Sequence, residues 1–178
     1  FLDSEGRVLS KALAENVLTR IHGKSALVAK VENKNKKQSA PLPYNLSSLQ
    51  IDAAKRYNLS AKMVLDTCQA LYEKHKLITY PRSDNRYLPL EHHKQASNIL
   101  QAIQNNTQLT SLCQGANISL KSRAWNNAKI SAHHAIIPTE KLANFSALST
   151  SEKQVYTLIS KQYLCQFYPA WEYLDGKI

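Results

Sequence analysis

Cysteine, glycine and proline are all scarce in this chain of 178 residues, and their scarcity excludes several classes of protein. The 3 cysteines lie far apart and form no Cys-x-x-Cys pair, which argues against both a disulfide framework and a zinc site. With 4 glycines and 6 prolines, the sequence is neither collagen-like nor of low complexity. Because no apolar run reaches the ~18 residues of a spanning helix, we expect no membrane partner.

Acidic residues are also few, and this shapes the expected partners. The 13 Asp and Glu residues are scattered and contain no Asp-x-Asp pair, whereas 23 Lys and Arg give a net charge of +10. Such an excess favours a polyanion such as nucleic acid. A merely basic soluble domain remains an alternative, because net charge does not locate the charges. Hydrophobic residues make up 43% of the chain, which is enough to bury a core.

The length fits one domain, or one domain plus parts of another. The sequence opens with Phe1 instead of Met and shows no targeting signal. We therefore expect a piece of a longer, cytoplasmic protein.

The first 43 residues predict a helix, a strand and a linker. Ser10 fits an N-cap and Gly23 fits a helix end, with apolar residues at helical spacing between them. Residues 26–32 are rich in small and β-branched side chains and predict a strand. The lysine-rich stretch at 33–43 has no periodicity and contains two prolines, so we expect a linker there and a new domain from about Leu42.

Two helices joined by a short turn follow. Ser47 and Gln50 form a capping-box pattern for a helix that ends at about Tyr57, and Ser60 fits the cap of a second helix through about Lys76. The side chains expected to face inward are Leu49, Ala53, Ala54, Tyr57, Val64, Leu65, Cys68, Leu71 and Tyr72. The pair is helix-turn-helix-like, an arrangement that also occurs in plain helical bundles.

The rest of the chain predicts short elements. In order, we expect a β-prone run at 77–80, a polar loop at 82–87, a helix at about 90–104, a loop with a short helical turn at 104–119, a helix from the capping box Ser149 and Glu152 through about Phe167, and the start of a strand at 171–178.

Tyr80 is the strongest candidate for a catalytic group, although most of the nine tyrosines are expected to be packing residues. A phenol with a pKa near ~10 needs nearby positive charge to act as a nucleophile at neutral pH. Arg82 lies two positions on, and in an extended segment both side chains face the same side, with Pro81 stiffening the backbone. A planar guanidinium suits two phosphate oxygens, and Arg86 adds charge nearby.

Two histidine pairs are the remaining chemical candidates. His133 and His134 lie inside an apolar run, where a histidine is usually a satisfied core residue. A functional histidine there could donate to phosphate or move protons near neutral pH. His92 and His93 lie at a helix start, where we expect a solvated face. Neither pair has the spacing of a metal site.

Several of these segments resemble one known family. Residues 77–84 (LITYPRSD) and 86–89 (RYLP) resemble the active-site tyrosine segment of type IA DNA topoisomerases. Residues 132–139 (AHHAIIPT) resemble the second motif of that family, and 42–50 (LPYNLSSLQ) resemble the start of the same domain. The motifs occur in the family's order, and PRSD and HHAIIP are more similar to bacterial topoisomerase III than to topoisomerase I.

The resemblance implies specific roles. Tyr80 attacks one DNA strand and becomes joined to its 5′ phosphate, Arg82 contacts the scissile phosphate, and His133 is the active-site histidine. His134 falls where topoisomerase I carries a glutamate. The residues expected to contact single-stranded DNA along its phosphate backbone are Ser47, Gln50, Ser83, Asp84, Arg86 and His134.

The resemblance also implies a mainly α (α+β) fold. A helical tyrosine domain at about 42–168, with a helix-turn-helix-like (winged-helix or CAP-like) core, is flanked at 1–41 and 169–178 by parts of a β-rich arch domain. The family holds Mg²⁺ on clustered carboxylates of a toprim-type domain, which this sequence lacks. We therefore expect no metal on this chain, partners in the remaining domains of a bacterial, nucleoid-associated parent, and DNA binding without relaxation by the fragment alone.

Two rival functions remain. A non-enzymatic helix-turn-helix module would use the two helices to grip DNA and Tyr80 only as a turn residue. A tyrosine recombinase joins its tyrosine to a 3′ phosphate and needs its Arg and His residues before the tyrosine. Here Tyr80 precedes His133, which disfavours that class.

Overall fold

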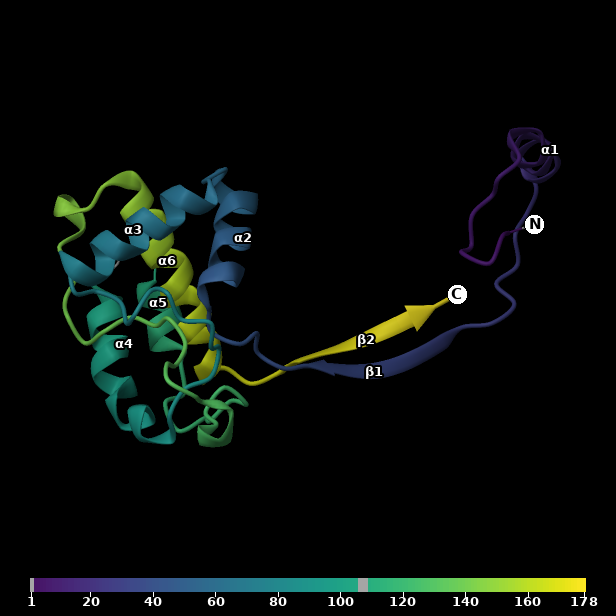
Figure 1. The fold of residues 1–178 in the computed structure, drawn as a ribbon. Coiled ribbons are helices and arrows are strands. Elements are labelled where there is room, and N and C mark those ends of the chain that lie inside the picture. The colour runs from purple at the N-terminus through teal and green to yellow at the C-terminus, as the bar shows by residue number, and fades with distance from the viewer. Residues whose placement is uncertain (1, 106–108) are drawn as a thin grey trace. The chain divides into compact units, whose positions relative to one another are not determined.

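The computed structural model describes residues 2–105 and 109–178, and it divides the chain into two compact units (Figure 1). The smaller unit contains the residues up to Lys36 together with Tyr173–Ile178, and the larger unit contains Lys37–Glu172. The part of the predicted 104–119 loop at 106–108 lies outside the described residues. Within the described part of the chain, no helix is long and apolar enough to cross a membrane.

The smaller unit contains helix α1 (Lys11–Ile21) and most of a two-stranded sheet, β1 (Glu32–Gln38) with β2 (Trp171–Lys177). The predicted cap is confirmed, because the Ser10 side chain accepts from the Leu13 amide at 3.3 Å. The predicted strand at 26–32 is wrong. The strand instead occupies the lysine-rich stretch that we predicted as a linker.

Cross-strand ion pairs explain why a lysine-rich segment is a strand. Lys36 pairs with Asp175 at 2.5 Å, and Lys37 pairs with Glu172 at 2.7 Å. Opposite charges facing each other across a sheet stabilise the pairing. The strand at 171–178 was predicted, but its partner could not be read from the local composition of 33–43.

The larger unit is helical (Figure 1). Its described α-helices are α2 (Leu46–Tyr57), α3 (Ala61–Glu73), α4 (Ala96–Gln104), α5 (Thr110–Gln114) and α6 (Thr150–Leu164). Its described 3-10 helices are η1 (Leu90–Gln95), η2 (Asn127–Lys129), η3 (Phe145–Ala147) and η4 (Cys165–Phe167). The predicted helix at 90–104 is therefore a 3-10 turn followed by α4.

Helix caps were predicted with one error. The N-caps Ser60 and Ser149 are confirmed, since their side chains accept from the amides of Met63 at 3.2 Å and Glu152 at 3.3 Å. Helix α2, however, is capped by Asn45 and not by Ser47. The Asn45 side chain accepts from the Ser48 amide at 2.9 Å, and the Ser48 hydroxyl accepts from the Asn45 amide at 3.1 Å. Asn is as good a cap as Ser, so the helix begins earlier.

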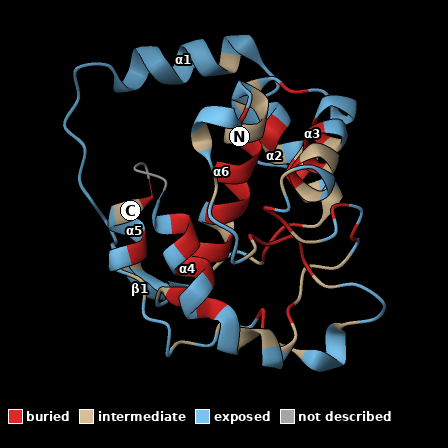
Figure 2. Ribbon diagram, turned by 90° about the vertical axis from the view of Figure 1, so that its left-hand side faces the viewer, coloured by how far each residue is buried: buried red, intermediate tan, exposed pale blue. Residues whose placement is uncertain are grey.

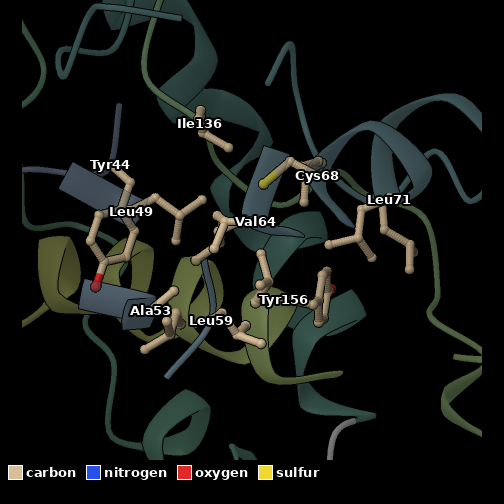
Figure 3. Close-up of a cluster of buried hydrophobic side chains, with 14 of the residues drawn as sticks. Tyr44, Leu49, Ala53, Leu59, Val64, Cys68, Leu71, Ile136 and Tyr156 are labelled. Carbon is tan, nitrogen blue, oxygen red and sulfur yellow. The ribbon is translucent and has the colours of Figure 1, made fainter. Parts of the chain in front are cut away.

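Helix α6 joins two hydrophobic clusters, and buried residues cover much of its surface (Figure 2). The first cluster packs α2 and α3 against α6, and Figure 3 shows its members Tyr44, Leu49, Ala53, Leu59, Val64, Cys68, Leu71, Ile136 and Tyr156. The second cluster packs α4, Trp125 and Phe167 around Tyr163 and Leu164. Of the predicted inward residues, Ala54 is exposed, and Tyr57, Leu65 and Tyr72 are half-buried.

An extended segment runs between the two clusters. Ile136 contributes to the first cluster, whereas its neighbours Ala135 and Ile137 contribute to the second. This alternation is that of a strand with both faces buried. The burial of both faces explains why the residues after the histidine pair are apolar. His133 is exposed and His134 is half-buried, because the segment reaches the surface at that point.

Candidate active site around Tyr80

Hydrogen bonds along two chain segments bring Tyr80 next to His133. The Thr79 amide donates to the Ile137 carbonyl at 2.9 Å, and the Thr139 amide donates to the Leu77 carbonyl at 2.9 Å. The Thr79 hydroxyl donates to the Ala135 carbonyl at 3.1 Å and accepts from the Ile137 amide at 3.0 Å. The backbone just before the candidate nucleophile is therefore fixed to the histidine segment.

The Tyr80 ring has two aromatic neighbours. It stacks on the His133 ring, with centroids 4.6 Å apart and planes 22° apart. It also makes an edge contact with Tyr72, with centroids 5.9 Å apart and planes at 83°. Tyr80 is nevertheless 39% exposed, so the residue lies at the surface.

Burial separates Tyr80 from three other tyrosines. Burial raises the pKa of Tyr156 to about 12, and it also raises the pKa values of Tyr163 and Tyr44. The Tyr44 hydroxyl additionally donates to Asp52, which holds its proton more firmly. A tyrosine that is buried and held in its protonated form is a poor nucleophile.

Arg82 is exposed, but the segment that joins it to Tyr80 does not have the extended geometry that we predicted. Pro81 and Arg82 lie in a turn, so the alternation of an extended segment does not place Tyr80 and Arg82 on one side. Pro81 is buried and takes the chain into this turn. Arg82 Nη2 instead donates to Gln69 Oε1 at 3.3 Å, which ties the guanidinium to helix α3.

The second histidine, His134, is constrained by its neighbours. Its Nδ1 donates to the Ala135 carbonyl at 2.9 Å, and its ring lies edge-on to His92 at 4.8 Å. Burial lowers the pKa of His134, and the nearby imidazoles lower it further. In its neutral form the other nitrogen, Nε2, is an acceptor and offers nothing to a phosphate oxygen.

The predicted solvated face of His92 and His93 is wrong. Both side chains are half-buried. His93 Nε2 donates to the Leu120 carbonyl at 3.0 Å, and its ring lies edge-on to Trp125 at 4.8 Å. The 3-10 geometry of η1 turns this pair inward, where we predicted one face of a regular helix.

The loop after Arg82 is fixed by a bond within itself and by bonds to residues 42–45. Ser83 is 1% exposed, and its hydroxyl accepts from the Asn85 amide at 3.1 Å. The Asp84 carbonyl accepts from the Asn45 side chain at 3.0 Å, while the Asp84 side chain is exposed. Arg86 donates from Nε to the Pro43 carbonyl and from Nη2 to the Leu42 carbonyl, both at 2.9 Å.

The two predicted DNA contacts on helix α2 differ in accessibility. Ser47 is exposed in the first turn of the helix. Gln50 is half-buried, and its side-chain nitrogen donates to the Ala61 carbonyl at 3.0 Å. Only Ser47 of this pair presents an uncommitted side chain at the surface.

Across 2–105 and 109–178, no group of three or more His, Cys, Asp or Glu side chains is arranged to hold a metal ion. A carboxylate-bound Mg²⁺ does not fit these residues.

Sequence reasoning missed two residues that contact the site. Tyr72 was assigned to the core side of its helix, and Gln69 was not singled out. Tyr72 lies 8 residues and Gln69 lies 11 residues before Tyr80, and neither position carries a local signal, because the contacts depend on the chain reversing after α3.

Comparison with known proteins places these residues in a family. A family model described as DNA topoisomerase matches residues 2–178. DNA topoisomerase 3 of Vibrio cholerae is 58% identical over 177 residues, covering 99% of this chain and 27% of the relative. DNA topoisomerase 3 of Haemophilus influenzae is 50% identical, covering 100% and 27%, and that of Bacillus subtilis is 38% identical, covering 97% and 24%.

The chain thus spans about a quarter of the length of these relatives. A solved structure of full-length topoisomerase I from Thermotoga maritima is similar in fold, with a TM-score of 0.66, 22% identity, and coverage of 98% of this chain and 28% of the other. Because the family model and the relatives match almost every residue, the chain belongs to the DNA topoisomerase family, in its type IA, topoisomerase III-like branch.

Proposed function

We propose that this chain carries the nucleophile of a type IA topoisomerase that breaks and rejoins one DNA strand, without ATP, through a 5′-phosphotyrosyl intermediate. The observation that supports this most is the position of Tyr80, exposed and stacked on His133 within the motif pair that the family matches. The substrate is single-stranded DNA, read through its phosphate backbone.

In the proposed step, Tyr80 Oη attacks a backbone phosphorus. The new bond joins Oη to the 5′ phosphate of one strand end, and the bond to the 3′ oxygen of the preceding nucleotide breaks. The phenol loses its proton, and the departing 3′ oxygen gains one. Because one phosphoester replaces another, the reverse attack by the 3′ hydroxyl reseals the strand with no external energy source.

Arg82 and His133 are proposed to stabilise the charge on the attacked phosphate. Arg82 is an exposed guanidinium held near the loop of Tyr80 by Gln69, and a guanidinium suits two phosphate oxygens. Stacking places the His133 nitrogens beside the phenol rather than in line with its O–H. His133 is therefore assigned to the phosphate, and the acceptor of the phenol proton is assigned to another group.

We propose that the DNA-facing surface includes Ser47, Asp84 and His134, with Ser83, Gln50 and Arg86 supporting its shape. Ser83 is buried, Gln50 donates to a backbone carbonyl, and Arg86 donates to two. His134 acts on a phosphate only when it is protonated, because its neutral form has no N–H left for the ligand. Its contribution to DNA affinity therefore grows as the pH falls.

The domain roles are also proposals. Residues 42–168 form the tyrosine domain with α2 and α3 as a helix-turn-helix-like, winged-helix or CAP-like core, and 1–41 with 169–178 are parts of the arch. Mg²⁺ binds to the remaining domains of the parent enzyme. The parent enzyme acts at the nucleoid of a bacterial cell. Alone, the chain binds DNA and does not relax it. Incubation of the chain with supercoiled plasmid and Mg²⁺ tests this, and efficient relaxation would contradict it.

The covalent step is tested in the full-length parent with end-labelled oligonucleotides. A 3′ label is expected to remain with the protein after denaturation, whereas a 5′ label is expected on a free fragment. Tyr80→Phe should abolish the adduct, and Tyr57→Phe, a change at a tyrosine away from the site, should not. An adduct that carries the 5′ label, or one that persists in Tyr80→Phe, contradicts the proposal. The rival DNA-binding module predicts that Tyr80→Phe changes nothing in the full-length enzyme.

A further inference from the structure

One face of helix α3 contacts the candidate nucleophile and its arginine. Gln69 accepts from Arg82 Nη2 at 3.3 Å, and Tyr72, three residues later, lies edge-on to the Tyr80 ring at 5.9 Å. Lys76, four residues further on, places its ammonium 5.7 Å from the centre of the Tyr72 ring. Residues three or four positions apart lie on the same side of a helix. Lys76 lies just past the end of α3, and its ammonium still reaches the Tyr72 ring on that side.

The backbone at Lys76 makes this arrangement possible. Its φ of 57° reverses the chain, so that the Leu77 amide donates to the Leu71 carbonyl at 2.9 Å. The Lys76 carbonyl accepts from the Thr139 hydroxyl at 2.7 Å. Residues 77–80 therefore run back beside α3 and bring Tyr80 to Tyr72. Glycine is the residue that usually occupies such a left-handed position, so this position carries a lysine at the expense of backbone strain.

We propose that Tyr72 is a positioning residue for Tyr80, braced by the Lys76 ammonium over its ring. This inference rests on the proposed function, because it concerns the same nucleophile. A cation close to an aromatic face is attracted to its π electrons, which restrains the Tyr72 ring. Tyr72 in turn restrains the Tyr80 ring, whose other ring contact among the described residues is the stack on His133.

The restraint matters because the attack is in line. The phenol oxygen must approach the phosphorus opposite the breaking bond, and Tyr80, at 39% exposure, has few contacts besides these rings to hold it there. Tyr72 touches neither the phosphate nor the proton being moved in this scheme. Its loss should therefore slow the covalent step and leave the affinity for DNA unchanged.

The test uses the full-length parent enzyme and single-turnover cleavage of a 3′-labelled oligonucleotide. Measuring the rate at increasing enzyme concentrations separates the maximal cleavage rate from the half-saturating concentration. Tyr72→Leu keeps apolar bulk at this half-buried position but removes the ring. We expect its maximal rate to fall about tenfold, since small misplacements of reacting groups have effects of that order or larger. We expect half-saturation to stay within about twofold.

Three further variants separate positioning from packing. Tyr72→Phe keeps the ring and should restore the wild-type rate. Tyr57→Leu is the matched control, because Tyr57 is also partly buried against the same cluster but makes no ring contact with Tyr80. It should cleave normally. Lys76→Gly removes the brace and the backbone strain together, so we expect slower cleavage with a higher Tm.

Each alternative result has a definite meaning. Wild-type cleavage by Tyr72→Leu, or equally slow cleavage by Tyr57→Leu, would overturn the positioning role of Tyr72. Wild-type cleavage by Lys76→Gly would overturn the bracing role of Lys76. The proposed function is judged separately by Tyr80→Phe. If that variant still forms the adduct, the nucleophile is wrong and the inference about Tyr72 fails with it.

Discussion

Asn45 links the start of helix α2 to the loop that follows the candidate nucleophile, and its substitution separates two contributions to stability. Its side-chain oxygen accepts from the Ser48 amide at 2.9 Å, and its side-chain nitrogen donates to the Asp84 carbonyl at 3.0 Å. Asn45→Ala removes both bonds. Asn45→Asp keeps an acceptor for the cap but has no donor for Asp84.

The expected magnitudes follow from these two bonds. Loss of an N-cap costs about 1 kcal/mol, and loss of one hydrogen bond costs about 0.5–1.5 kcal/mol. Asn45→Ala should therefore lower the free energy of unfolding by about 2 kcal/mol. Asn45→Asp should cost about 0–1 kcal/mol, since a carboxylate at a helix N-terminus regains about 0.3–1 kcal/mol from the helix dipole.

The assay is urea unfolding of the chain, followed by circular dichroism and by fluorescence of the buried Trp125. Ser60→Ala is the matched control, because Ser60 caps helix α3 through the Met63 amide. It should cost only the cap, about 1 kcal/mol. If Asn45→Ala costs no more than Ser60→Ala, the bond to Asp84 contributes nothing. If Asn45→Asp is as destabilised as Asn45→Ala, the N-cap bond of residue 45 contributes nothing to stability.

Three further changes test other parts of the larger unit. Burial alone would raise the pKa of Glu152, but hydrogen bonds from Ser149 and His75 hold this pKa below its ordinary value. The stabilisation that Glu152 gives the fold is therefore present above pH ~4.5 and is lost as the pH falls through the lowered pKa. Urea unfolding of Glu152→Gln should therefore depend less steeply on pH between about 3 and 5 than unfolding of the wild type. Tyr163→Phe should keep or raise Tm, because the buried Tyr163 hydroxyl has no hydrogen-bond partner among the described residues, and a loss above about 1 kcal/mol would contradict this. Arg86→Ala should lower stability by about 1–3 kcal/mol in urea unfolding by freeing two carbonyls, and an unchanged midpoint would refute the structural role of Arg86.

Local signals predicted the helices of this protein well. Ser10, Ser60 and Ser149 cap the helices that they were expected to cap, because capping depends on residues three apart in the sequence. Asn45 shows the limit of such signals. The pattern at 45–50 contains several residues that can cap, and contacts with the loop at Ser83 and Asp84 help to set which of them does.

Long-range pairing accounts for the main errors. Strand β1 forms where Lys36 and Lys37 meet Asp175 and Glu172, more than one hundred residues away in the chain, and the composition of 33–43 does not reveal that. Similarly, the local sequence gave no reason for Tyr80 to meet His133, and only the family resemblance joined them. Tyr72 was placed among core residues because helical periodicity does not distinguish a ring that faces the core from one at its edge.

The two arginines after the nucleophile show why a functional surface is harder to predict than a helix. A guanidinium matches two phosphate oxygens, and it matches two backbone carbonyls equally well. Arg86 is committed to the carbonyls of Leu42 and Pro43, whereas exposed Arg82 makes one longer bond, to Gln69. The same residue type, four positions apart, thus serves the fold in one case and remains exposed at the surface in the other. Under the proposed function, a phosphate beside Tyr80 would meet the exposed Arg82 and the exposed His133 imidazole among the described residues, and we expect the rest of the parent enzyme to supply further positive charge for its transition state.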